Sequence, residues 1–223
     1  MFKNCSSLSS ISVKFTSWGT NSQTTNWVNG VAANGIITKP YELSEETGSS
    51  RIPNGWTVEI DDYSKAPITF VAVDDSVSLE FHNDSDPQTV SLDYNKNNTG
   101  WTTVTVNDPI SLDAGDKIAF RGYNNSGFNN GSDSPYKFTA SGDGKLKVYG
   151  NTMSLLDSSD FATKTVFDFL INPTYIFQSL FQGMSSLVDA SKLLLPATQL
   201  GDYGCSFCYN NMFYGCTSLT AVP

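Results

Sequence analysis

Two cysteines three residues apart, Cys205 and Cys208, form the pair in this chain that could carry redox or metal chemistry. A C-x-x-C pair indicates a redox centre beside a βαβ pattern, or a zinc site when further cysteines or histidines complete the ligand set. No βαβ pattern follows this pair, and the chain has only four cysteines and one histidine, His82, which is distant in sequence. The sequence therefore favours buried or incidental thiols, and we expect neither metal nor cofactor.

Close pairs of aspartates could serve acid–base catalysis or bind a hard cation. The pairs are Asp61-Asp62, Asp74-Asp75, and Asp84 with Asp86. All lie in stretches typical of turns, where aspartate is favoured because its side chain accepts backbone hydrogen bonds. Calcium binding at "NDSDPQ", residues 83–88, stays open as an alternative, although the full EF-hand spacing is missing. His82 is interpreted as a surface strand residue in preference to a ligand.

No set of residues indicates an enzyme. A single histidine without a G-x-S-x-G context disfavours a Ser-His-Asp hydrolase. The chain contains neither a P-loop nor a G-x-G-x-x-G phrase. We therefore predict a protein without catalytic residues.

Aromatic residues in loops and beside turns are better candidates for function. Phe128 lies at the centre of the loop "GYNNSGFNNGSDSPY", which begins next to Tyr123. A long loop with an aromatic at its centre suits partner binding. Tyr94 and Trp101 flank the hairpin "NKNNTG" and could form a second contact surface. The alternative, which we weigh more heavily for these two, is cross-strand packing. The predicted partner-binding residues are Phe128, Tyr123, Tyr94 and Trp101.

The charge and hydropathy of the chain limit the classes of partner that it is expected to bind. Among 223 residues, 22 Asp and Glu outnumber 13 Lys and Arg, so the net charge is −9. That sign disfavours nucleic acid and anionic membranes, and no apolar run approaches the roughly 20 residues of a membrane span. Abundant Asn, Ser, Thr and Gly among many aromatics are common in secreted or surface β-proteins. The chain shows no signal peptide, so we expect either that it is not exported or that its start is a fragment boundary.

A repeated phrase dominates the organisation of the chain. Residues 175–187 read "YIFQSLFQGMSSL" and residues 207–219 read "FCYNNMFYGCTSL". We call these the first copy and the second copy. Met1–Leu8, "MFKNCSSL", aligns with the last eight residues of both, and we call it the opening copy.

The spacing within these copies predicts helices. Apolar positions at steps of one, four, five and eight share one stripe of a helix. Gly183 and Gly215 then stand where a left-handed residue ends a helix, and Asn4 takes that position in the opening copy. The residues after Leu187 and Leu219 alternate as in short strands. Such helix–turn–strand units cannot bury their apolar stripe alone, so we expect them to stack as a solenoid.

The phrase M-F-x-[GN]-C-[ST]-S-L, together with "LPAT-x-L", resembles the BspA-like leucine-rich repeats of gut and oral anaerobic bacteria. The matching residues are Met212–Leu219, Leu195–Leu200 and Met1–Leu8. The resemblance implies a leucine-rich repeat fold and adhesion at a bacterial surface. Met184 stands where the family has cysteine, so we expect the equivalent Cys5 and Cys216 to fill the core.

The region between the copies predicts a β-module. Residues 27–35 suggest one more short helix, followed by strands near Ile36 and from Trp56 to Ile60. Seven later runs are rich in β-branched and aromatic residues, and turn signals separate them. The expected fold is mixed α and β, a central immunoglobulin-like β-sandwich flanked by partial leucine-rich repeat segments. The expected domains are 1–60, the end of a repeat array with its cap; 61–150, the β-sandwich; and 151–223, the start of a second array.

These expectations combine into a non-catalytic interaction protein, adhesin-like and extracellular or at the cell surface, which binds a host or bacterial protein or a glycan. The alternatives are a carbohydrate-binding accessory module, with or without enzymatic activity, and a phage appendage or fibre component. We also expect head-to-tail self-association through exposed repeat ends.

Overall fold

The computed structural model describes residues 1–19, 23–84, 90–124, 135–167, 170, 174–199 and 205–223. The chain divides into two compact units, Met1–Tyr63 and Ser64–Pro223, and each is described by itself. Regular structure in the described residues consists of β-strands and three 3₁₀ turns, η1 (Tyr63–Lys65), η2 (Thr152–Leu155) and η3 (Phe161–Thr163). The protein is therefore almost all β, and the predicted mixed fold with helical leucine-rich repeats is wrong.

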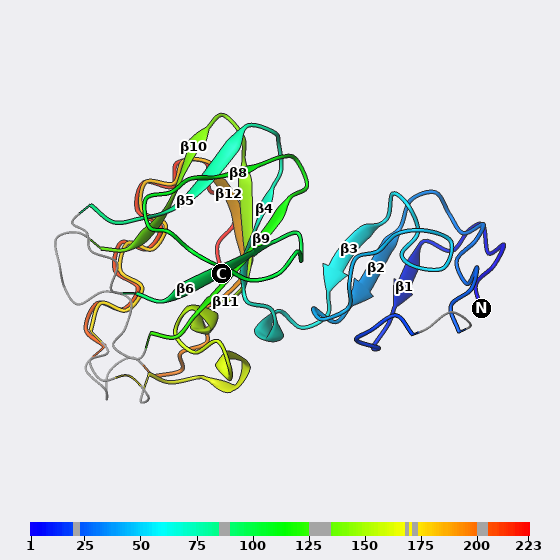
Figure 1. Ribbon diagram of the computed structural model, residues 1–223, viewed down its shortest axis with the longest axis horizontal. Helices are drawn as coiled ribbons and strands as arrows, with labels where there is room; N and C mark the ends of the chain where they lie inside the picture. Colours follow the sequence, from blue (N-terminus) through cyan, green and yellow to red (C-terminus); the bar gives the residue numbers. More distant parts are fainter. Residues whose placement is uncertain (20–22, 85–89, 125–134, 168–169, 171–173, 200–204) are drawn as a thin grey trace. The chain divides into compact units, whose positions relative to one another are not determined.

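A three-stranded parallel sheet forms the frame of the first unit (Figure 1). Its strands are β1 (Ser10–Ser12), β2 (Ile36–Lys39) and β3 (Thr57–Ile60), in that order. The predicted strands near Ile36 and before Ile60 are confirmed. Ile37 is fully buried at the centre of this sheet, among side chains that the alternation of a strand turns to one face. The core around it comprises Ile11, Val13, Trp27, Val28, Leu43, Ile52 and Trp56.

Two further sheets build the second unit. The smaller sheet has the order β10-β5-β8, with β5 (Val77–His82), β8 (Ile110–Leu112) and β10 (Lys137–Gly142). The larger has the order β12-β11-β4-β9-β6-β7, and its strands are β4 (Ile68–Ala72), β6 (Leu92–Lys96), β7 (Thr102–Thr103), β9 (Lys117–Gly122), β11 (Leu146–Asn151) and β12 (Leu187–Leu194). Only the β11–β12 pair is parallel, and the other pairs of both sheets are antiparallel. Each of the seven predicted runs contains a strand, whereas β8 was not predicted.

One apolar core lies between these two sheets. Phe138 of β10 contacts Phe70 of β4 and Phe120 of β9, with ring centroids 4.9 and 4.8 Å apart. Phe181 of the first copy joins the same cluster, 6.1 Å from Phe138. Two sheets that share a core are consistent with a β-sandwich, and the first copy packs on that core as well.

The predicted helices of the two copies are absent, and runs of four-residue turns replace them. Within the first copy, backbone N–H groups donate to the carbonyl three residues earlier, as from Leu180 to Phe177 and from Met184 to Phe181. A left-handed residue recurs every fourth position: Tyr175, Ser179 and Gly183, at φ 63°, 59° and 78°. An α-helix cannot pass through such residues. A turn that repeats every four residues therefore produced the apolar spacing that predicted a helix.

The helix expected over residues 27–35 is wrong for the same reason. Asn26 and Gly30, again four residues apart, have φ values of 52° and 78°. Trp27 and Val28 lie in the turn between them and are buried in the core of the first unit. Their burial was predicted by the apolar spacing, but their backbone conformation was not.

The first and second copies lie side by side, as the orange and red segments of Figure 1 show. Gly183 and Gly215 both have φ of 78°, and Asn4 has φ of 64°, so the predicted left-handed conformation is confirmed at all three. Leu187 is fully buried where β12 begins, whereas Leu219 is partly buried. The copies therefore stack as predicted from their shared phrase, but without helices.

Candidate functional site

The candidate site is a group of side chains on three adjacent strands of the larger sheet, together with Trp101, which directly precedes β7. The guanidinium of Arg121 on β9 lies over the ring of Trp101, 4.0 Å from its centroid. Arg121 is opposite Asp93 of β6 in the register, and its Nε lies 4.0 Å from Asp93 Oδ2. Thr103 of β7 donates from Oγ1 to Asp93 Oδ1 at 3.1 Å. We call Trp101, Arg121, Asp93 and Thr103 the Trp101 surface.

The Trp101 surface combines an aromatic face with charges that solvent reaches. Trp101 is half-buried, and the relative solvent exposures of the Arg121 and Asp93 side chains are 36% and 38%. A cation over an indole ring is held in place by the quadrupole of the ring. Tryptophan and arginine are the residues most enriched among those that dominate binding energies at interfaces. The arrangement is thus suited to hold a ligand against a preformed stack.

Tyr94 does not belong to this surface. Its ring packs toward Phe120, at a centroid distance of 6.4 Å, and is partly buried against the core. Phe120 and Arg121 are consecutive in β9, so their side chains point to opposite faces of the sheet. Tyr94 therefore lies on the face opposite Trp101. Of the two alternatives for Tyr94, packing is the one that its position favours, though its partner is Phe120 rather than Trp101.

Tyr123 follows β9 directly and is 63% exposed. The next residue, Asn124, holds this end of the strand: its Oδ1 accepts from the N–H of Ser91, and its Nδ2 donates to the carbonyls of Ser91 and Leu155. Tyr123 is two residues from Arg121, the spacing at which strand side chains share a face. Phe128 lies outside the described residues.

Arg121, Asp93 and Thr103 are the residues of this site that the sequence did not single out, and Arg121 is the one that contacts the Trp101 ring. Its partner Trp101 is twenty residues earlier, and only the register of β9 with β6 brings them together. A lone arginine in an alternating strand is usually a solvated side chain, so local pattern carried no signal for its role.

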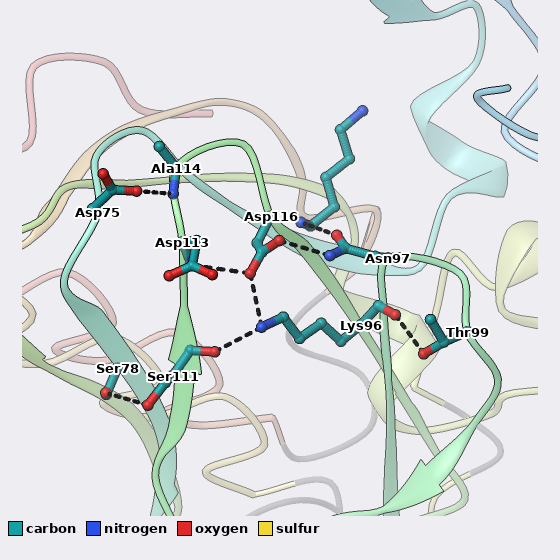
Figure 2. A network of polar contacts seen from close by, with 10 residues as sticks. Asp75, Ser78, Lys96, Asn97, Thr99, Ser111, Asp113, Ala114 and Asp116 are labelled. Carbon is teal, nitrogen blue, oxygen red and sulfur yellow. Dashed lines mark hydrogen bonds and ion pairs between the residues drawn. The ribbon is translucent and has the colours of Figure 1, made fainter. Parts of the chain in front are cut away.

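A second polar cluster joins the two sheets and is structural (Figure 2). Lys96 of β6 donates from Nζ to Asp116 Oδ2 at 2.7 Å and to the carbonyl of Ser111 on β8 at 2.9 Å. Asp116 also accepts from Asn97 Nδ2 at 2.6 Å and from the N–H of Asp113 at 2.9 Å. These hydrogen bonds hold the pKa of Asp116 at about 2, with that from Lys96 contributing most. Each member of this cluster is engaged by another.

The acid titration of Asp116 should report this cluster. Its pKa is lower in the folded chain than in the unfolded chain, so its stabilising contribution is complete above the ordinary aspartate value of about 3.9. That contribution is lost as the pH falls through about 2. We expect Lys96→Met to raise the pKa of Asp116 toward the ordinary value, as measured by carboxyl ¹³C NMR. Lys14→Met, which removes the partner of Asp61, is the control, and an unchanged Asp116 pKa in Lys96→Met would contradict the assignment.

The aspartates singled out in the sequence mostly have structural partners. Asp75 Oδ1 accepts from the N–H of Ala114 at 2.7 Å (Figure 2), as expected of an aspartate in a turn. Asp61 accepts from Lys14 Nζ at 2.9 Å. Asp84 accepts from His82 Nε2 at 2.7 Å and pairs with Lys137. The remainder of the proposed calcium segment, residues 85–88, lies outside the described residues.

His82 lies on the solvent side of β5, as predicted. Its Nδ1 lies 2.6 Å from Glu80 Oε1 and its Nε2 contacts Asp84. Burial acts to lower the pKa of His82, but the hydrogen bonds to Asp84 and Glu80 outweigh it and raise the pKa above its usual value. The imidazole is thus held between two carboxylates.

The cysteines differ from one another in state. Cys205 and Cys208 are both buried, as expected, but they are joined in a disulfide, so the expectation that they are thiols is wrong. Cys216 is buried, and burial raises the pKa of its thiol, so its predicted role as a core filler is confirmed. Cys5 is exposed, contrary to prediction.

Within the described ranges, no group of three or more His, Cys, Asp or Glu side chains is placed to hold a metal ion. None of the helices found among those residues has the length and apolar character needed to cross a bilayer. Comparisons with protein-family models, with curated proteins and with solved structures gave no match.

Proposed function

We propose that this chain is a non-catalytic interaction protein that binds a protein or glycan ligand on the Trp101 surface. The observation that carries the proposal is the stack of Arg121 on Trp101, flanked by Asp93 and Thr103. An indole face can stack on a sugar ring or an apolar side chain. The polar groups beside it can fix the orientation of either ligand by hydrogen bonds. The exposed ring of Tyr123 adds a second aromatic anchor at the end of the same strand.

The proposed location is extracellular or at a cell surface. Two features support it: the disulfide between Cys205 and Cys208, a bond that persists in oxidising compartments, and the resemblance of the repeated phrase to BspA-like surface proteins. A phage appendage that carries the same phrase is the alternative source.

A binding screen with surface variants tests the proposed function. The chain is screened against a glycan array and a panel of extracellular proteins, and every hit is measured again with Trp101→Ala and Arg121→Ala. We expect each change to weaken binding by about tenfold or more, because residues of this kind cost about 2 kcal/mol when they anchor an interface. Tyr214→Ala removes an exposed aromatic side chain elsewhere in the unit and should leave binding unchanged. Ligands that bind Trp101→Ala and Arg121→Ala as tightly as the parent chain would exclude this surface as the binding site.

A further inference from the structure

The other residues of the Trp101 surface hold the guanidinium of Arg121 in one position. The Trp101 ring lies against it, 4.0 Å from ring centroid to guanidinium carbon. Asp93 Oδ2 lies 4.0 Å from Nε, which is a contact between charges and too long for a hydrogen bond. Asp93 is itself anchored, because its Oδ1 accepts from Thr103. The guanidinium is therefore oriented before a ligand arrives.

A buried amide fixes the place of Trp101 in this arrangement. Asn95 of β6 is 8% exposed, and its Oδ1 accepts from the N–H of Gly100 at 3.2 Å. Gly100, at φ 122°, directly precedes Trp101. Asn95 and Asp93 are two residues apart in β6, so their side chains share one face of the sheet. The same strand thus positions both the aromatic ring and the carboxylate that flank Arg121.

The terminal nitrogens of Arg121, Nη1 and Nη2, are left for a ligand. Among the described residues they have no hydrogen-bond acceptor. The chain's other arginine, Arg51, is instead engaged: its Nε donates to Glu46 at 2.9 Å and its Nη1 to the carbonyl of Ser50 at 3.0 Å. The two terminal N–H groups of a guanidinium form a fork that matches the two oxygens of a carboxylate. Arg121 is thus suited to bind a carboxylate end-on.

Asp93 restricts what else such a ligand can carry. A second anionic group on the ligand would be repelled by Asp93 and by a chain of net charge −9. Hydroxyl groups are favoured there, because an ionised carboxylate only accepts hydrogen bonds and that of Asp93 is 38% exposed. The ligand that fits has one carboxylate with hydroxyl groups on neighbouring atoms. A uronic acid carries both on a single sugar ring.

We propose that the Trp101 surface binds a glycan through a sugar that carries a carboxylate, such as a uronic acid. The carboxylate accepts from Nη1 and Nη2 of Arg121, and a neighbouring hydroxyl donates to Asp93. The exposed ring of Tyr123, two residues after Arg121, is available to the apolar face of the sugar. The inference rests on the proposed function and narrows its ligand, from a protein or any glycan to an acidic glycan.

Titration with sodium glucuronate, followed by the ¹⁵N–¹H signals of the arginine side chains, tests the proposal. We expect glucuronate to shift the Nε–H signal of Arg121 saturably and to leave that of Arg51, the internal control, unchanged. Glucose lacks the carboxylate and acetate lacks the hydroxyl groups, so each should need at least about tenfold higher concentrations. An Arg121 signal that glucuronate does not move, or that acetate moves at the same concentrations, would overturn the proposal.

Two variants separate the guanidinium fork from general attraction between charges. Arg121→Lys keeps the charge but removes the fork, and should weaken glucuronate binding about tenfold or more. Lys147→Met, the control, removes an exposed cation from β11 of the same sheet and should leave binding unchanged. Saturation-transfer NMR of glucuronate measures the affinity of both variants. Equal affinities of Arg121→Lys and the parent chain, or equal losses in the two variants, would contradict the proposal.

The binding screen distinguishes failure of this inference from failure of the proposed function. For this purpose each acidic glycan of the array is paired with the same glycan after reduction of its carboxylate to an alcohol. Binding of the acidic member alone, lost in Arg121→Lys, is the expected result. Neutral glycans, sulfated glycans or proteins that bind equally well through Trp101 and Arg121 would overturn the inference but leave the function. Ligands that never depend on Trp101 would exclude both.

Discussion

Phe138→Ala should lower the free energy of unfolding of the Ser64–Pro223 unit by about 3–5 kcal/mol, the range for removal of a buried phenylalanine. Phe138 is fully buried, and its ring lies within 4.9 Å of Phe70 and 4.8 Å of Phe120. It is also the residue at which both sheets and the first copy meet, through Phe181. The cavity left by alanine would therefore remove contacts from three parts of the unit at once.

Denaturant unfolding followed by near-ultraviolet circular dichroism measures this effect. In thermal unfolding followed by the same signal, the melting temperature should fall by roughly 6–20 °C, from about 2–4 °C for each kcal/mol in a unit of this size. Tyr214→Ala is the aromatic control, because Tyr214 is 70% exposed, and surface changes of this kind usually stay within about 0.5 kcal/mol. Equal losses for the two variants would show that Phe138 is not at the centre of a packed core.

Lys39→Met should destabilise the Met1–Tyr63 unit by several kcal/mol. Lys39 ends β2 and is 1% exposed. Its ammonium donates to the carbonyls of Leu43 at 2.6 Å and Pro40 at 3.2 Å, and it lies 3.7 Å from Glu45 Oε1. Methionine keeps the apolar stem but removes every donor, and each buried acceptor left unpaired costs about 1–3 kcal/mol.

The control for this substitution is Lys14→Met in the same unit. Lys14 forms an ion pair with Asp61 at 2.9 Å, but its side chain is 77% exposed, so we expect a cost of about 0–1 kcal/mol. Urea unfolding monitored by the fluorescence of the tryptophans of this unit compares the two variants. A Lys39→Met chain as stable as Lys14→Met would mean that the buried ammonium does not hold the Pro40–Glu45 turn in place.

The strands of both units could be predicted from the sequence because the pattern that indicates a strand is local. Alternation of apolar and polar residues identified β4, β5 and β9 without knowledge of their neighbours. The short strand β8 was missed because three residues are too few to alternate recognisably.

The turns of the copies could not be predicted from the sequence, since a left-handed conformation at Tyr175 or Ser179 has no signature in residue type. A glycine at position 183 indicates that conformation, whereas the tyrosine at 175 and the serine at 179 do not. Steps of four in the apolar pattern fit both a helix and a series of four-residue turns. The stacking of the copies was nevertheless predictable, because similar phrases place equivalent groups in register.

The candidate site was only partly predictable. Trp101 and Tyr123 could be proposed as binding residues, but the partnership of Trp101 with Arg121 depends on strand register. The burial of Lys39 was likewise invisible, because a lysine at the end of a strand usually reaches solvent. In each case the missing information is long-range: which backbone lies opposite which.

The parallel pairing of β12 with β11 has a consequence for synthesis on the ribosome. Phe138 and Phe70 leave the ribosome before Phe181, which completes their core, and before Leu187–Leu194, which adds the last strand to the larger sheet. Until that later segment emerges, the nascent sandwich carries an open sheet edge and an incomplete apolar layer. Such an intermediate is prone to aggregate, and a chaperone that binds extended apolar segments would find its target in this interval of translation.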